Sequence, residues 1–237
     1  LLTQSPPPPI PIQEEMDVVD PLIPQGKSWV NAPYENDLID NRRGVMLKMW
    51  WVGRLLSRDT SLTAKMTLFW HNHFVSESDT VKDSRYSYQY VNLLHAHALG
   101  NFKKLILEGT TNQAMLVYLN GNTNTKNAPN ENYARELLEL FTIGKGKGSK
   151  YTEDDVRAAA RVLTGWKDDK EKITSLFNPE LHDTGDKQFS SFFDNKIIKG
   201  KSGNEGVKEI AELIEMILEQ KETARFVCRN LYRWFVT

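Results

Sequence analysis

The sequence has a single cysteine, no long apolar run and almost no net charge. Cys228 is the only cysteine among 237 residues, which excludes an internal disulfide and a cysteine-based metal cluster. Because it lies in an apolar helical pattern, we expect it to be a buried thiol. No stretch of about 18 apolar residues is present, so we expect no transmembrane helix. The net charge of -1, from 30 basic and 31 acidic residues, indicates no surface for nucleic acid.

Strand signals are also absent from the sequence. Apolar and polar residues do not alternate over a useful length, and no internal repeat is found. From about Arg42 onward, apolar residues instead recur at helical spacing, as in Leu62, Met66, Phe69 and Trp70. A chain that is 40% hydrophobic can form one sizeable core. We therefore expect an all-α fold, a multi-helix bundle.

Two segments depart from this helical pattern. Residues 1–41 begin rich in proline and predict an extended arm or linker before a helical domain over 42–237. Residues 167–206 are polar and predict a long loop, and loops of about 40 residues are more often functional or mobile than neutral. The chain begins without methionine or a signal peptide and ends directly after an apolar helix. We expect it to be a fragment of a longer protein, truncated at its C-terminus as well.

One predicted helix, over residues 129–144, combines an apolar stripe with many polar groups. Pro129 suits its first turn and Gly144 the position after its last. Glu131, Arg135 and Glu139 form an i, i+4, i+8 ladder, which on an exposed face would contribute only about 0.3–0.5 kcal/mol per pair. Glu136 lies off this ladder, near the edge of the stripe, and could orient a histidine or pair with an arginine. The next helix is predicted to begin with the capping box Thr152-x-x-Asp155.

The histidines suggest a second constellation. They form three clusters: His71 with His73, His95 with His97, and His182 beside Asp183. Residues two apart on a helix differ by roughly 200°, and the periodicity makes His73 and His97 the inward members. Two inward histidines on different helices could converge on a metal or a substrate, although no i, i+4 histidine pair is present. They could equally be core histidines with satisfied hydrogen bonds.

The His182-Asp183 pair lies in the long polar segment. Functional groups often lie on loops that rigid helices hold in place, but adjacent histidine and aspartate is also common in ordinary turns. Nucleophilic catalysis has little support, because no Gly-x-Ser-x-Gly motif is present.

Several motifs follow one another in an order that resembles a known family. They are Trp70-His71-Asn72-His73-Phe74, His97-Ala98-Leu99-Gly100-Asn101-Phe102, the segment 129–144, Tyr151-Thr152-Glu153-Asp154-Asp155-Val156, Leu163-Thr164-Gly165-Trp166 and His182-Asp183-x-Gly185-x-Lys187. From about Arg42 to its end, the chain resembles the bacterial "domain of unknown function 1800" family. The resemblance implies a mostly helical protein, often exported to the periplasm or cell surface, whose gene lies beside one for a sulfatase-like companion. It implies no reaction.

Two hypotheses of different classes remain open. In the leading one, a polar pocket between helices is closed by the His182 segment, and the protein hydrolyses or modifies a cell-surface or exported substrate. Its candidate catalytic residues are His73, His97, Glu136, His182 and Asp183. Its candidate substrate-binding residues are Asn72, Asn130, Glu131, Asn132, Arg135 and Lys187. A divalent metal is a possible cofactor, with no ligand set assigned.

The alternative is a non-catalytic helical scaffold or binding module, whose polar motifs are buried networks that specify one packing. Its partner could be the sulfatase-like companion. An enzyme predicts these polar groups around a solvent-reachable cavity. A scaffold predicts that they are paired and dry, with apolar surface exposed elsewhere.

Overall fold

The computed structural model describes residues 10–13, 19–56 and 62–236. The proline run at residues 6–9, on which the predicted arm partly rests, lies outside the described residues. Residues 19–36 form turns and extended backbone with no regular element, and the first helix begins at Asp37. Within that segment Trp29 is fully buried against Met46 and Leu47 of the first helix, so the segment packs on the body.

The described residues form ten α-helices, five short 3-10 or π segments and four short strands. They are α1 (Asp37–Leu56), α2 (Leu62–His73), α3 (Ser78–Val81), α4 (Ser84–Ala96), α5 (Phe102–Thr110), α6 (Gln113–Tyr118), η1 (Gly121–Thr123), α7 (Glu131–Glu136), η2 (Leu137–Thr142), α8 (Glu153–Val162), β1 (Trp166–Asp169), β2 (Thr174–Phe177), η3 (Pro179–Leu181), β3 (Lys187–Gln188), η4 (Ser191–Phe193), β4 (Ile197–Ile198), η5 (Gly203–Val207), α9 (Lys208–Glu219) and α10 (Lys221–Val236). No helix among these residues is both long and apolar enough to cross a membrane.

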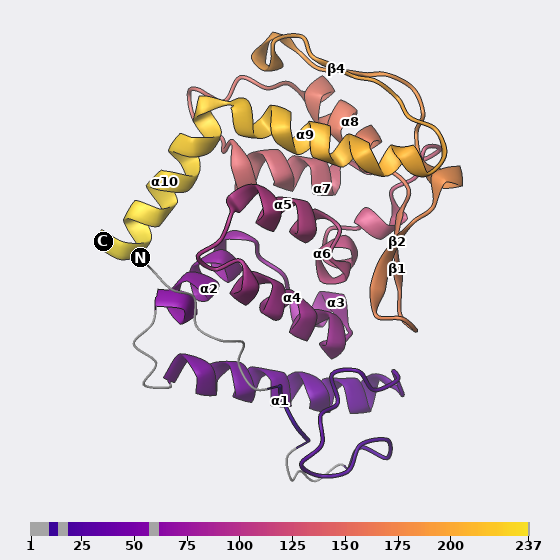
Figure 1. The fold of residues 1–237 in the computed structure, drawn as a ribbon, viewed down its shortest axis with the longest axis vertical. Coiled ribbons are helices and arrows are strands. Elements are labelled where there is room, and N and C mark those ends of the chain that lie inside the picture. Colours follow the sequence, from indigo (N-terminus) through magenta and orange to yellow (C-terminus); the bar gives the residue numbers. More distant parts are fainter. Residues whose placement is uncertain (1–9, 14–18, 57–61, 237) are drawn as a thin grey trace.

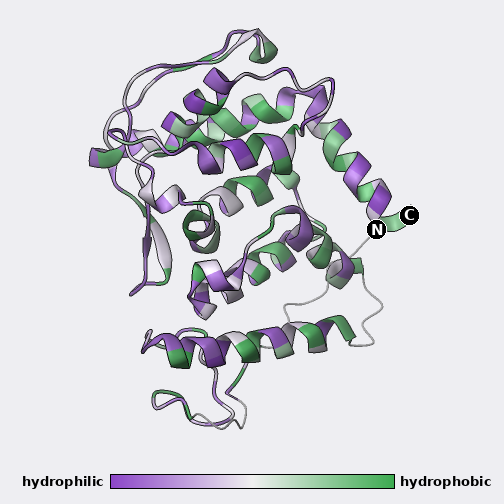
Figure 2. Cartoon of the chain, turned by 180° about the vertical axis from the view of Figure 1, so that it is seen from behind, coloured by the Kyte–Doolittle hydropathy of each residue, from purple (hydrophilic) through white to green (hydrophobic). Residues whose placement is uncertain are grey.

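The helices are stacked in layers, with α1 at one end and α8 and α9 at the other (Figure 1). Hydrophobic and hydrophilic residues alternate around the helices, as expected where each helix buries one side (Figure 2). The main core lies between the layers and includes Phe69, Leu105, Leu137, Val156 and Ile214. The mostly helical prediction is thus confirmed.

Two small sheets correct the expectation of an all-α fold with a long loop. Strand β1 pairs antiparallel with β2, with Trp166 opposite Phe177, and β3 pairs antiparallel with β4, with Lys187 opposite Ile198. Strands of two to four residues are too short to show the alternation by which a strand is recognised in a sequence. The segment predicted as a loop is therefore ordered around short pairings and 3-10 turns.

The segment predicted as one helix over 129–144 consists of α7 followed by the π-helical segment η2. Its predicted end is confirmed, because Gly144 has a φ of 81°, in the left-handed region that favours glycine. The capping box is also confirmed, with Thr152 accepting from the Asp155 N–H and Asp155 accepting from the Thr152 N–H. The π turn was not predicted, and such turns are frequent at functional sites.

Candidate functional site

The family-motif residues His182 and Lys187 meet a carboxylate from α9 in the interior. Oε1 of Glu209 lies 3.1 Å from Nε2 of His182, and Oε2 accepts from Nζ of Lys187 at 2.6 Å. The backbone N–H of Lys201 also donates to Oε1, at 2.6 Å. The three side chains are at most 1% exposed. Residues His182, Lys187 and Glu209, the buried triad below, therefore form a sealed and hydrogen-bonded network.

The imidazole of His182 is held from both sides. Its Nδ1 lies 3.0 Å from the carbonyl oxygen of Thr164, while its Nε2 faces the carboxylate of Glu209. The Thr164 hydroxyl in turn accepts from the N–H of Asp183 and donates to the carbonyl of Arg161. A ring fixed in this way has one orientation, which suits a structural role.

Glu209 was missed by the sequence analysis, although a signal for it exists. On α9, Glu209 shares a face with Leu213, Met216 and Ile217, which are all buried. Glu209 lies four residues before Leu213, at the start of this apolar stripe. A carboxylate at such a position is unusual, because burying a charge without partners is costly. The signal indicates a buried carboxylate, but not which residues pair with it.

Asp183 joins the same region through Arg161 of α8. Nε and Nη2 of Arg161 donate to the two carboxylate oxygens of Asp183 at 2.7 and 3.0 Å. Burial raises the pKa of Asp183, but the hydrogen bonds from Arg161 and from the Gly185 N–H, together with the charges of Arg161 and Lys187, lower it overall. Lys187 also donates to the Asp183 carbonyl. The structure thus brings together His182, Asp183 and Lys187, three of the predicted site residues, on one side of α8.

His73 and Asn72 lie at a different place, beside an open cavity of about 260 Å³ between α2 and α10. Nε2 of His73 lies 2.8 Å from the carbonyl oxygen of Phe141, and its ring stacks on Phe69. Burial lowers the pKa of His73, against the opposing effect of the hydrogen bond with Phe141. The cavity is also lined by Asn230, Arg233 and Trp234 of α10. Of the two predicted site residues that line this cavity, Asn72 is exposed, whereas His73 is buried, with 9% of its surface exposed.

His97 was predicted to be the inward member of its pair, but this prediction is wrong. His95 is 6% exposed, whereas the His97 side chain is 15% exposed and its Nε2 lies 2.8 Å from a carboxylate oxygen of Glu108. The reason is that α4 ends at Ala96, so His97 no longer follows the helical periodicity. Cys228, predicted as a buried thiol, is exposed on α10.

Glu136 makes neither of the pairings considered from the sequence. Its Oε2 is buried and has no hydrogen-bond partner among the described residues. Burial raises the pKa of Glu136, and the neighbouring charge of Glu139 adds to the rise. No hydrogen bond in the described part joins Glu136, His73 and His97 to one another. The three principal acid-base candidates therefore have separate surroundings.

The remaining candidates lie around α7. Arg135 pairs with Glu131 at 3.0 Å and with Glu153 of α8 at 2.8 Å, and these pairs raise its pKa. Asn130 caps α7, and Nδ2 of Asn132 donates to the Leu119 carbonyl at 3.2 Å. These contacts tie α7 to its neighbours. Within the described chain, no group of three or more histidine, cysteine or acidic side chains is arranged to hold a metal ion.

Comparisons with known proteins identify a family for this chain, but no individual relative. No curated protein and no solved structure matches it. Residues 22–237 match the family described as "Protein of unknown function (DUF1800)", which extends the similarity beyond the motifs to most of the chain. The match covers more than half of the sequence, so the chain belongs to the DUF1800 family.

Proposed function

We propose that this chain is a non-catalytic helical binding module whose family-motif residues build its interior. The buried triad is the observation that carries the proposal. A general acid or base must come within hydrogen-bond reach of its substrate, and His182 and Lys187 are at most 1% exposed. Their polar atoms are engaged by Glu209, Thr164 and the Asp183 carbonyl. Fully satisfied buried networks specify a packing and make it rigid.

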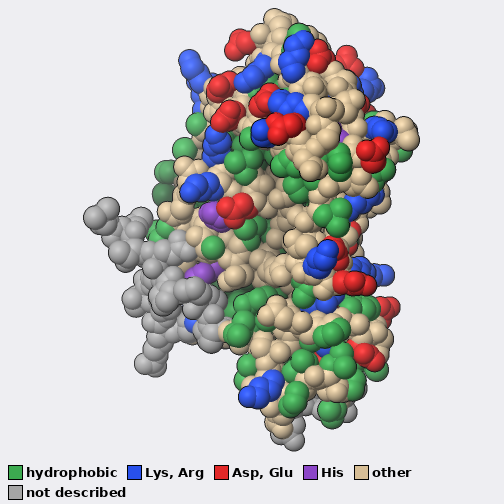
Figure 3. Space-filling model, turned by 45° about the vertical axis from the view of Figure 1, so that its right-hand side comes forward, with side chains coloured by type: hydrophobic (Ala, Val, Ile, Leu, Met, Phe, Trp, Pro, Cys, Tyr) green, Lys and Arg blue, Asp and Glu red, His purple; other side chains and the backbone are tan. Residues whose placement is uncertain are grey.

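The docking surface of such a module would be the outer side of α1. Leu38, Val45, Met49, Val52 and Leu56 are 42–79% exposed and are spaced by seven, four, three and four residues, which places them on one side of the helix. Hydrophobic side chains also gather at the end of the molecule formed by α1 and the segment before it (Figure 3). Contiguous exposed apolar residues mark interaction sites.

The partner in this proposal is the sulfatase-like companion that the family resemblance implies, in the exported, cell-surface setting of such proteins. The test is co-purification of the full-length protein with the sulfatase-like product of the adjacent gene. We expect Met49→Glu with Val52→Glu to abolish the complex. The matched control is Val207→Glu, a charge at another exposed apolar residue, which should leave it intact. Equal complex formation by both variants would reject α1 as the docking surface.

A second candidate function is favoured by the cavity between α2 and α10. There His73 and Asn72 line an open cavity that a substrate could enter, as a hydrolase acting on a cell-surface or exported substrate would require. The test is metal analysis of the full-length protein, purified without chelator or affinity histidines, against His73→Ala. Stoichiometric metal that is lost in the variant would favour this candidate over the binding module. Absence of metal from both the parent and the variant would exclude a metal-assisted hydrolase.

A further inference from the structure

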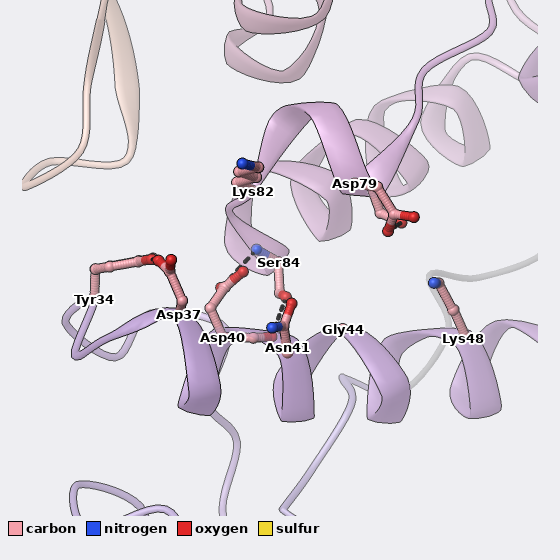
Figure 4. Close-up of a pocket in the computed structure, with 10 residues that line it drawn as sticks. Tyr34, Asp37, Asp40, Asn41, Gly44, Lys48, Asp79, Lys82 and Ser84 are labelled. Carbon is pink, nitrogen blue, oxygen red and sulfur yellow. Dashed lines mark hydrogen bonds between the residues drawn. The ribbon is translucent and has the colours of Figure 1, made fainter.

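Two open cavities of similar volume lie outside the buried triad. The one between α1 and the α3–α4 turn has a volume of about 240 Å³ (Figure 4). Its charged side chains are spread along it, since Asp40 is held at Ser84 and Lys48 lies eight residues farther along α1. The one between α2 and α10, of about 260 Å³, instead gathers its polar groups over a short length of two helices.

The walls of this second cavity are two helix faces that lie side by side (Figure 1). Each helix contributes three residues at i, i+3 and i+4, which lie on one face of a helix. They are Phe69, Asn72 and His73 of α2, and Asn230, Arg233 and Trp234 of α10. The ring centroid of Phe69 lies 6.0 Å from that of Trp234. The ring centroid of His73 lies 5.9 Å from that of Phe226. The two helices therefore run in opposite directions here, and the cavity lies between these two aromatic contacts.

His73 presents a fixed hydrogen-bond acceptor to the cavity. Its Nε2 lies 2.8 Å from the carbonyl oxygen of Phe141, which can only accept, and burial lowers the pKa of His73 so that the ring is neutral. Nε2 therefore carries the ring proton, and Nδ1 carries the lone pair. Nδ1 has no hydrogen-bond partner among the described residues and is not sealed from solvent. A ligand in the cavity can thus donate a hydrogen bond to Nδ1.

The two asparagines add groups that both donate and accept. Neither the Asn72 amide nor the Asn230 amide forms a side-chain hydrogen bond within the described residues. Each offers an oxygen that accepts and an NH₂ group that donates. Both lie on the turns of helix between the two aromatic contacts and line the same cavity as His73. One small ligand can therefore reach all three polar groups.

The charges of the wall disfavour simple ions as ligands. No lining residue in the described chain is acidic and Arg233 is a cation, so an ammonium ligand finds no carboxylate. A lone carboxylate or phosphate would place its oxygens against the lone pair of His73 Nδ1. A hydroxyl suits every position, because it can donate to Nδ1 and can both donate to and accept from an amide. The polar wall therefore matches a neutral ligand with several hydroxyls.

The rest of the wall is aromatic and small. Phe69 and Trp234 close one end of the cavity, and aromatic rings pack well against apolar C–H groups. A pyranose ring has hydroxyls around its edge and C–H groups on its faces, so it matches both parts of the wall. The volume of about 260 Å³ lies below the range of about 300–1,000 Å³ for drug-sized ligands, which suits one such ring. Peptides also donate and accept, but they dock on sheet edges or in apolar grooves, and this cavity is neither.

We propose that the cavity between α2 and α10 binds one pyranose unit of a carbohydrate. A sugar hydroxyl donates to Nδ1 of His73, and neighbouring hydroxyls pair with the amides of Asn72 and Asn230. The ring face packs on Trp234. This cavity is also that of the second candidate function, yet binding of a sugar here rests neither on hydrolysis nor on docking at α1.

The test is NMR titration of the full-length protein with isotopically labelled histidine rings. The probes are the methyl pyranosides of glucose, galactose, mannose and N-acetylglucosamine. We expect at least one of them to bind saturably, with a Kd below about 10 mM, and to shift the Nδ1 resonance of His73. No saturable binding of any of the four, or saturation that leaves His73 Nδ1 unchanged, would overturn the proposal. Methanol released in the same samples would report hydrolysis separately, so the loss of one function is not mistaken for the loss of the other.

Two comparators separate sugar binding from less specific contacts. Cyclohexanol has a ring of the same size with a single hydroxyl, and N-acetylglycine N-methylamide carries only peptide groups. Each should bind at least about tenfold more weakly than the best glycoside. Equal or tighter binding of either comparator would overturn the proposal, in favour of an apolar or a peptide ligand.

Variants locate the binding in this cavity. Asn72→Leu and Asn230→Leu each remove one amide, and leucine is the better helix former, so the thermal midpoint should not fall. Each should weaken binding of the best glycoside at least about tenfold. Asn41→Leu removes an exposed asparagine of α1 beside the other cavity and is the matched control, which should bind as the parent does (Figure 4). Parent affinity in both cavity variants would overturn the proposal.

Discussion

Replacement of Glu209 is the sharpest test of the interior described above. In Glu209→Leu, the Lys187 ammonium loses its 2.6 Å carboxylate partner in a place with no access to solvent. The imidazole of His182 and the N–H of Lys201 lose an acceptor as well. Removing one partner of a buried ion pair costs about 3–5 kcal/mol, because the other charge is left uncompensated. For a chain of this size, that lowers the thermal midpoint by about 6–20 °C.

The measurement is urea unfolding of four proteins: the parent, Glu209→Leu, Lys187→Met and the double variant. The double variant should lose less free energy of unfolding than the sum of the single losses, since it leaves no unpaired ammonium. Glu219→Gln, on the same helix with a side chain 68% exposed, is the control and should cost less than about 0.5 kcal/mol. A loss below about 1 kcal/mol for Glu209→Leu, or additive losses, would refute the reasoning.

The pKa values of Glu209 and His73 and two helix-end residues, Thr152 and Gly144, give further tests. Burial raises the pKa of Glu209, but the hydrogen bonds from His182 and Lys187 help to lower it below its ordinary 4.5. The stabilisation by the charged Glu209 should therefore be present above about pH 4.5 and be lost as the pH falls through the folded pKa. Acid unfolding of the parent and of Glu209→Gln measures this difference. The pKa of His73, lowered from 6.5 by burial, should appear below 6.5 in its NMR titration, and its contribution to stability should fall below that pH; a value above 6.5 would contradict the burial. Thr152→Ala should cost about 1 kcal/mol in urea unfolding, with Thr152→Ser close to the parent. Gly144→Ala should cost more than about 1 kcal/mol, because its φ is +81° and a Cβ would meet the Phe226 ring; a loss smaller than that of Thr152→Ala would contradict this account.

Local signals predicted the helix ends well. The Thr152 capping box and the turn at Gly144 need only residues that are neighbours in the chain, so the sequence contains all of their chemistry. The mostly helical fold followed from apolar spacing for the same reason. The periodicity was misleading where a helix ended, as at His97, and also within α10, where Cys228 is exposed.

Such local signals could not predict which residues pair over long distances in the sequence. Glu209 lies 27 residues from His182 and 22 from Lys187, and no local pattern relates a carboxylate on one element to cations on another. The π turn over residues 137–142 depends equally on tertiary packing, because an α-helix would follow from the same apolar stripe. The sequence could therefore name candidate residues, but not how they group in space or which partner each has.

The ordering of residues 167–206 has a consequence for how the protein opens. This segment has little regular structure, yet its Lys187 and His182 are held by a carboxylate on α9 that no solvent reaches. Releasing the segment breaks the hydrogen bonds of His182 and Lys187 to Glu209 and opens the packing around α9, so we expect the segment and α9 to open together. The amide protons near residues 182–189 should then exchange with solvent at the same rate as those of α8 and α9, because these parts open as one cooperative unit. Proteases should cut the segment only when that unit unfolds.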